Sequence, residues 1–108
     1  KVVVCGGSNA MGEGLNTVES YDPKEKAWCE CKPMLRRVIN HSALVLGGGL
    51  YIFGGGPQVS LGTPAESFVY RLDLATGIWE EQRPMQACRA GFCAAVIRSC
   101  PPAEHWRR

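Results

Sequence analysis

A pattern of about 50 residues that occurs twice sets the strongest limit on how this chain folds. Each copy has, in the same order, a short apolar run closed by two glycines, an Asp with Trp six residues later, and a Pro-Met pair. The matching pairs are residues 2–7 with 50–55, 22–28 with 73–79, and 33–34 with 84–85. The first pair is offset by 48 residues and the others by 51, so one insertion of three residues reconciles them. A repeat of this length indicates a chain built from similar stacked units.

Short β-strands are expected throughout both copies. The apolar runs closed by glycines are typical of buried strands, other segments alternate apolar with polar residues, and two runs end at a proline. No segment combines a sustained helical period with helix caps. The expected strands are residues 2–5, 17–21, 28–32, 41–46, 50–53, 68–72, 79–82 and 91–97. Four short strands per repeat predict an all-β chain made of β-propeller blades.

The order of these marks resembles the Kelch repeat over residues 1 to about 99. In this family a strand ending in Gly-Gly is followed by Tyr-Asp-Pro, by Trp, by Pro-Met and by a strand opened by Arg. The first copy follows the pattern closely. In the second copy Leu72 stands where Tyr is expected before Asp73, with Tyr70 two positions earlier. After Met34 the expected Arg position holds Val38, and Arg37 lies one residue earlier.

This resemblance predicts a partial Kelch β-propeller of about two blades, each a four-stranded antiparallel sheet. Residues 1–34 are expected to supply three strands of one blade, and residues 40–85 a complete blade. Residues 89–99 are expected to form the innermost strand of a further or ring-closing blade, and residues 100–108 an irregular tail. Because closed propellers have about four to eight blades, we expect a piece of a larger ring.

Several repeat residues are predicted to be structural. Glycines at the end of the second strand of a blade allow a positive φ and let the backbone approach the next blade closely. The tryptophans are large enough to fill the space between neighbouring blades, and the aspartates belong to turns. The residues assigned to this group are Gly6, Gly7, Tyr21, Asp22, Trp28, Gly54, Gly55, Tyr70, Asp73 and Trp79.

Composition argues against several classes of partner. The net charge of +2 gives no strong reason to expect nucleic acid or anionic lipid, and no apolar run approaches the roughly 20 residues of a membrane helix. Six cysteines in a chain with ample core-forming residues are predicted to be reduced thiols, which places the protein in the cytoplasm or the nucleus.

No motif predicts catalysis, a cofactor or a metal. Cys29 and Cys31 lie two residues apart, but a zinc site needs four ligands and the only histidines are His41 and His105. Cys88, beside a basic residue, is the best candidate for a reactive thiol. We expect His41 to be structural. The glycine-rich segments lack the Lys-Ser/Thr that follows a phosphate-binding loop.

The loops are the predicted functional region. Those over residues 8–16, 35–40, 56–67 and 86–90 should share one face of the propeller. Resemblance to Kelch-like proteins that carry a BTB domain implies that this face binds a protein partner. The matching positions are Ser8, Asn9, Arg36, Arg37, Pro57, Gln58 and Arg89. Arginine suits an acidic degron, because its planar guanidinium grips a carboxylate through two hydrogen bonds.

Three functions follow from the resemblance. The first is the substrate-recognition part of a BTB-Kelch adaptor for a cullin-RING ubiquitin ligase, in which the cullin binds only through a BTB domain that these residues do not include. The second is an actin or cytoskeletal scaffold. The third is a fragment of a Kelch-fold enzyme of the oxidase or sugar-epimerase type, for which the sequence offers no catalytic residues.

Overall fold

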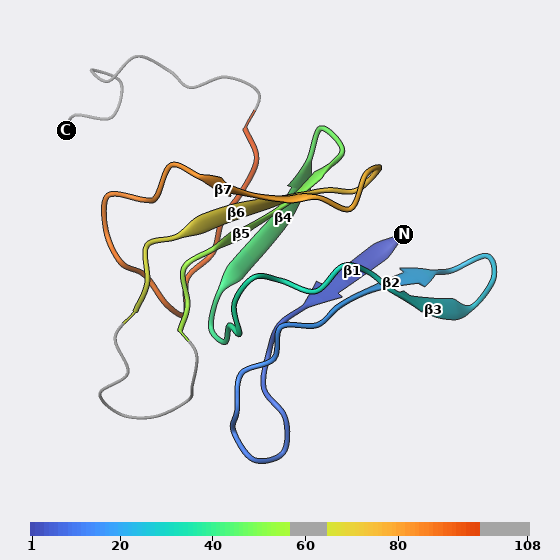
Figure 1. Cartoon of the computed structure of the whole chain (residues 1–108), viewed down its shortest axis with the longest axis horizontal. Helices are drawn as coiled ribbons and strands as arrows, with labels where there is room; N and C mark the ends of the chain where they lie inside the picture. Colours follow the sequence, from blue (N-terminus) through green and yellow to red (C-terminus); the bar gives the residue numbers. More distant parts are fainter. Residues whose placement is uncertain (57–64, 98–108) are drawn as a thin grey trace.

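The computed structural model describes residues 1–56 and 65–97, and over that range the chain forms two antiparallel sheets (Figure 1). β1 (Val2–Cys5), β2 (Val18–Asp22) and β3 (Ala27–Glu30) make a three-stranded sheet in that order. β4 (Ser42–Leu46), β5 (Gly49–Phe53), β6 (Val69–Asp73) and β7 (Trp79–Gln82) make a four-stranded sheet. The all-β class with about two blades is confirmed. The described ranges contain no helix that is long and apolar enough to cross a membrane.

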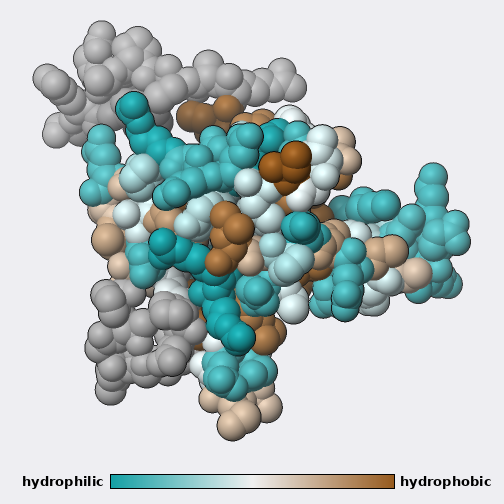
Figure 2. All heavy atoms as spheres, in the orientation of Figure 1, coloured by the Kyte–Doolittle hydropathy of each residue, from teal (hydrophilic) through white to brown (hydrophobic). Residues whose placement is uncertain are grey.

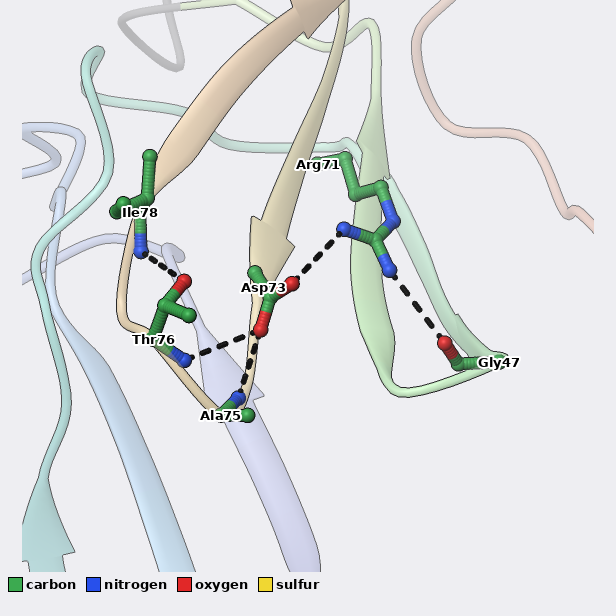
Figure 3. Close-up of polar contacts among 6 residues, drawn as sticks. All are labelled: Gly47, Arg71, Asp73, Ala75, Thr76 and Ile78. Carbon is green, nitrogen blue, oxygen red and sulfur yellow. Dashed lines mark hydrogen bonds and ion pairs between the residues drawn. The ribbon is translucent and has the colours of Figure 1, made fainter.

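An aspartate shapes one hairpin turn in each sheet. The Asp22 carboxylate accepts the backbone N–H of Lys24 at 2.9 Å in the β2–β3 turn. In the β6–β7 turn the Asp73 carboxylate accepts the N–H groups of Ala75 at 2.9 Å and Thr76 at 3.0 Å (Figure 3). Such contacts hold the chain in a tight reversal. The Thr76 and Ala75 N–H groups, with a smaller contribution from Arg71 at 3.6 Å, hold the pKa of Asp73 below its ordinary value.

The core lies between the two sheets rather than within either of them. Alternation in β5 and β6 places Leu50 opposite Leu72 and Ile52 opposite Tyr70, all on one face. This face packs against the first sheet through Val18 of β2. The complete buried cluster is Val18, Met34, Val38, Leu50, Ile52, Phe68, Tyr70 and Leu72. One apolar core shared by two sheets means that neither sheet is buried without the other.

The two repeat tryptophans occupy different surroundings. Trp79 of β7 packs against the shared core, and its indole N–H donates to the backbone carbonyl of Lys32 at 3.2 Å. Trp79 therefore fills space between neighbouring blades and ties β7 to the end of the first sheet. Trp28 of β3 lies 54 % exposed and contacts only one aromatic neighbour in the described chain, Tyr21, with ring centroids 5.0 Å apart.

Each sheet has a second face that the shared core does not cover. On the first sheet Val2 and Val4 of β1 and Trp28 of β3 are exposed, and on the second Leu46 is exposed. In Figure 2 hydrophobic residues appear among hydrophilic ones across the middle of the view, whereas the projecting end at the right is mainly hydrophilic. These faces are the ones that further blades would cover in a propeller.

Residues 89–97 differ from the expectation of an innermost strand over 89–99. Within 89–97 the structure has no strand: Arg89 forms an isolated bridge with Glu66 and its carbonyl accepts the N–H of Gly55 at 2.8 Å, and the N–H of Gly91 donates to the Asn40 carbonyl at 2.7 Å. Residues 98–99 and the tail at 100–108 lie outside the described residues. A strand needs a hydrogen-bonded neighbour, and no described strand pairs with this segment. The division of the chain into blades otherwise stays a prediction, with the two sheets falling inside residues 1–34 and 40–85.

Candidate partner-binding site

The predicted loops meet at one end of the molecule, which we call the loop end. It consists of the connections over residues 6–17, 31–41, 54–56 with 65–68, and 83–91. The β1–β2 loop reaches the bottom of Figure 1, whereas the β4–β5 turn points to the top. The two ends of the sheets therefore differ: one carries short turns and the other carries the longer connections.

Backbone hydrogen bonds join the loops of the two sheets. The N–H of Gly7 donates to the carbonyl of Val38 at 2.9 Å. Ile39 and Gly56 exchange two bonds, of 2.7 and 3.0 Å. Further along, the N–H of Glu66 donates to Gly55 at 2.9 Å. The first sheet, the β3–β4 connection and the second sheet are thus tied in sequence, and we call this run of bonds the seam.

Glycine is required where the seam is tightest. Gly6 has φ of 68°, and a Cβ there would come within 2.8 Å of the Val38 carbonyl oxygen. Gly55 has φ of 82°, and its Cβ would lie 2.9 Å from the Cβ of His41. Both positions combine left-handed backbone with a close approach, which only glycine meets without strain. Gly54 has a positive φ as well, with its Cβ position facing the Glu66 carbonyl oxygen at 3.0 Å.

Arg36 lies across the seam on an aromatic surface of the second sheet. Its Nε donates to the Tyr70 hydroxyl at 3.0 Å. Its guanidinium carbon lies 5.1 Å from the centroid of the Phe68 ring and 5.9 Å from that of Tyr70. Its Nη1 lies 3.5 Å from a carboxylate oxygen of Glu66. Cation–π contacts and the hydroxyl fix the position of the charge.

Arg37 is held on the first-sheet side of the same hollow. Its Nη1 donates to the Gly14 carbonyl at 3.3 Å. Arg36, Arg37, Gly56, Glu66 and Phe68 line a hollow of about 290 Å³. The structure therefore brings two of the predicted arginines together at one place.

The other predicted contact residues do not line that hollow. The Asn9 side chain serves its own loop, where Oδ1 accepts the N–H groups of Met11 at 2.9 Å and Glu13 at 3.1 Å. Ser8 is exposed and forms a bridge with Gly14. Arg89 lines a separate hollow of about 350 Å³, which includes Leu44 and Phe53 of the second sheet. Pro57 and Gln58 lie outside the described residues.

The loop end also holds a partly buried pair formed by Cys5 and His41. The Cys5 Sγ lies 3.6 Å from Nε2 of His41, and Nδ1 of His41 is buried with no hydrogen-bond partner among the described atoms. Burial raises the pKa of Cys5 to about 11 and lowers the pKa of His41, the latter against a smaller opposing effect of Cys5. Both shifts favour the neutral forms of the two groups. The structural role expected for His41 stays a prediction.

The cysteines that the structure describes form no cluster that would hold a metal. The described ones, Cys5, Cys29, Cys31, Cys88 and Cys93, are free thiols. Cys31 packs against the shared core, whereas Cys29 and Cys88 are exposed. Among residues 1–56 and 65–97, no three His, Cys, Asp or Glu side chains come together as a potential metal site.

Sequence reasoning missed Glu66 and Phe68 as parts of the site. Phe68 and Tyr70 are two residues apart, which in an extended segment puts both side chains on the same side. That signal was present in the sequence. Their contact with Arg36 could not be read from it, because the contact depends on how the two sheets pack.

Two packed antiparallel sheets with glycine-tied loops define a repeat protein of the propeller class. Comparison with known proteins narrows this class. The family model for the Kelch motif matches residues 1–35. Kelch-like protein 36 of the rat, Rattus norvegicus, is 33 % identical over 88 residues, which cover 82 % of this chain and 14 % of that protein. Human Kelch-like protein 6 is 40 % identical over 63 residues, covering 58 % of this chain and 10 % of that protein.

A plant relative also matches. F-box/kelch-repeat protein OR23 of Arabidopsis thaliana is 30 % identical over 91 residues, covering 74 % of this chain and 21 % of that protein. This chain belongs to the Kelch-repeat family, and it spans only a small part of the length of these relatives. The repeats and the Kelch-like relatives support a protein-interaction module, because Kelch repeats generally serve binding rather than catalysis.

Proposed function

We propose that this chain is a substrate-recognition segment of a BTB-Kelch adaptor for a cullin-RING ubiquitin ligase, and that it binds an acidic segment of its partner at the loop end. The observation that carries the proposal is the pair Arg36 and Arg37 beside one hollow of about 290 Å³. The role is binding without catalysis. The cullin would be recruited by a BTB domain elsewhere in the protein.

The geometry of the pair favours a carboxylate ligand. Each guanidinium has five N–H donors, and the described contacts use two on Arg36 and one on Arg37. The remaining donors make no hydrogen bond to residues 1–56 or 65–97 and would suit an incoming carboxylate, and the seam fixes the backbone that carries both arginines. An acidic side chain would gain charge-assisted hydrogen bonds, which are stronger than those between neutral groups.

Binding of a labelled hexaglutamate peptide to the full chain, measured by fluorescence anisotropy at low salt, tests the acidic-ligand part. Arg36→Gln and Arg37→Gln should each weaken binding at least about 5-fold, as loss of about 1 kcal/mol implies. Lys24→Gln removes the same charge at the opposite end and should leave binding unchanged. Equal losses in all three variants would refute a local site, since they would reflect net charge alone.

Affinity purification of the natural protein that carries this chain tests the adaptor part. We expect a cullin in the eluate, retained when Arg36 and Arg37 are both replaced, and a substrate protein that is lost from the double variant. Actin in place of a cullin would contradict the adaptor role and favour the scaffold. Recovery of the components that accompany F-box proteins would also contradict the BTB assignment while leaving substrate recognition in place.

We also propose a cytoplasmic or nuclear location, supported by the five free thiols among the described residues. Exposed Cys29 and Cys88 should react with a cell-permeant alkylating reagent in intact cells, as measured by mass spectrometry. Their recovery as disulfides under the same conditions would contradict this location.

A further inference from the structure

Three kinds of contact hold the guanidinium of Arg36, and they differ in strength. They are made by the Tyr70 hydroxyl, by the rings of Phe68 and Tyr70, and by the Glu66 carboxylate. The Tyr70 hydroxyl and the Phe68 and Tyr70 rings are parts of the shared core, so their positions are fixed by packing. The Glu66 contact differs, since its 3.5 Å distance is long and the two side chains are 47 % and 37 % exposed. Exposed ion pairs of this kind are weak because water screens them.

The backbone of Glu66 is nonetheless firmly placed. Its N–H donates to Gly55 at 2.9 Å, and its carbonyl accepts the N–H of Arg89 at 2.9 Å. The carboxylate can therefore leave Arg36 through rotation of its own side chain, without any change in the seam. A free carboxylate would then stay tethered close to the hollow.

We propose that Glu66 is a built-in competitor for the acidic group of the partner, a statement that rests on the proposed function. In the free protein its carboxylate contacts the Nη1 edge of Arg36, and an acidic side chain of the partner displaces it. No covalent step is involved. Tyr70 and Phe68 hold the Arg36 guanidinium in position, and Glu66 lowers the affinity of the site for acidic segments.

Two consequences follow from this arrangement. Every acidic ligand must first break the Arg36–Glu66 contact, and it then lies close to the displaced carboxylate, which repels it. Removing the charge of Glu66 should therefore strengthen binding rather than weaken it. A purely structural role for Glu66 predicts the opposite sign or no change.

Glu66→Gln in the full chain, titrated with the same labelled hexaglutamate peptide at low salt, tests this. We expect binding about 3- to 10-fold tighter than wild type, in keeping with the small energies of exposed pairs. Glu25→Gln, in the β2–β3 turn at the opposite end, removes one negative charge far from Arg36 and should change binding much less. Tyr70→Phe keeps the ring but removes the hydroxyl, and it should weaken binding.

A double variant separates local competition from general charge. The gain from Glu66→Gln should be clearly smaller in the Arg36→Gln background, because the contact to be broken is gone and only the repulsion of the ligand remains. An undiminished gain there, or an equal gain from Glu25→Gln, would overturn the proposal. If Arg36→Gln weakens binding and Glu66→Gln has no effect, the competitor role is wrong and the proposed acidic site stands. If neither Arg36→Gln nor Arg37→Gln matters, the proposed site itself fails.

Discussion

The two sheets carry the same repeat but depend on different surroundings. In the four-stranded sheet Trp79 reaches the shared core and donates to the Lys32 carbonyl, whereas the equivalent Trp28 of the three-stranded sheet is 54 % exposed. The residue type and local strand are alike in both. The difference is that the Trp79 side of its sheet has a neighbouring sheet and the Trp28 side has none among the described residues. A repeat residue thus contributes through the adjoining blade more than through its own.

The largest expected contrast is between the covered and uncovered faces. Ile52→Ala removes a side chain with 0 % exposure and should lower the free energy of unfolding by about 3 kcal/mol. Val4→Ala, on the uncovered face with 47 % exposure, should cost less than about 1 kcal/mol. Urea unfolding measures both. If Ile52→Ala does not fold, Ile52→Val should cost about 1 kcal/mol. Equal costs at the two positions would mean that the sheets do not share a core.

The next contrast compares neighbouring glycines at the seam. Gly6 and Gly7 have φ of 68° and 91°, so alanine at either position would be strained by the left-handed backbone and would lower the free energy of unfolding. Only at Gly6 would the new Cβ meet Val38 and His41, while at Gly7 nothing lies within 4 Å. Gly6→Ala should therefore lower stability by about 1 to 3 kcal/mol more than Gly7→Ala in urea unfolding. The reverse order would show that the loops do not meet in the way described.

A smaller effect is expected at the tryptophans. Trp79→Phe loses the indole hydrogen bond to Lys32 and should cost about 1 kcal/mol or more. Trp28→Phe removes no such bond in the described structure and should cost less than about 0.5 kcal/mol. Thermal unfolding of the two variants compares them directly. A larger cost at Trp28 would contradict the assignment of Trp79 as the residue that joins the blades.

The smallest effect is the pH response of the β6–β7 turn. The pKa of Asp73 in the folded chain is lower than its ordinary value of 3.8, so its ionised form favours folding above that pH. This contribution is lost as the pH falls through the lowered pKa. The melting temperature of Asp73→Asn should fall less steeply in acid than that of wild type. Arg71→Gln should remove only part of the response, because the Thr76 and Ala75 N–H groups are the larger cause. Parallel acid profiles for wild type and Asp73→Asn would contradict this.

The strands could be predicted from the sequence because local pattern determines them. The apolar run at β1 predicts Val2–Cys5, and Trp79–Gln82 forms as expected before Pro84. At β3 the strand is Ala27–Glu30 instead of 28–32, a small shift at an element end. Residues 89–97 have the apolar content of a strand, but a strand forms only beside a partner, and the local pattern carries no information about that partner.

The site was predictable only in outline. The blade topology that the Kelch resemblance implies predicts loops at one end, and the shifted Arg position of the family pattern points to Arg36 and Arg37. The sequence gives no sign that Arg36 crosses to Phe68, Tyr70 and Glu66, which are 30 or more residues away. The sequence likewise does not show that the Arg89 side chain lies apart from those of Arg36 and Arg37. The Arg89 backbone hydrogen-bonds within the seam, but its side chain lines another hollow.

The central claim is that the seam joins the two sheets into one unit that presents Arg36 and Arg37. Residue-resolved amide hydrogen exchange tests it most directly, using the donors that cross between loops: Gly7, Ile39 and Gly56. The account predicts protection of these amides within about 10-fold of that of Ile52 in the buried β5 strand. Exchange at the rate of an unstructured peptide at all three, with Ile52 still protected, would contradict it.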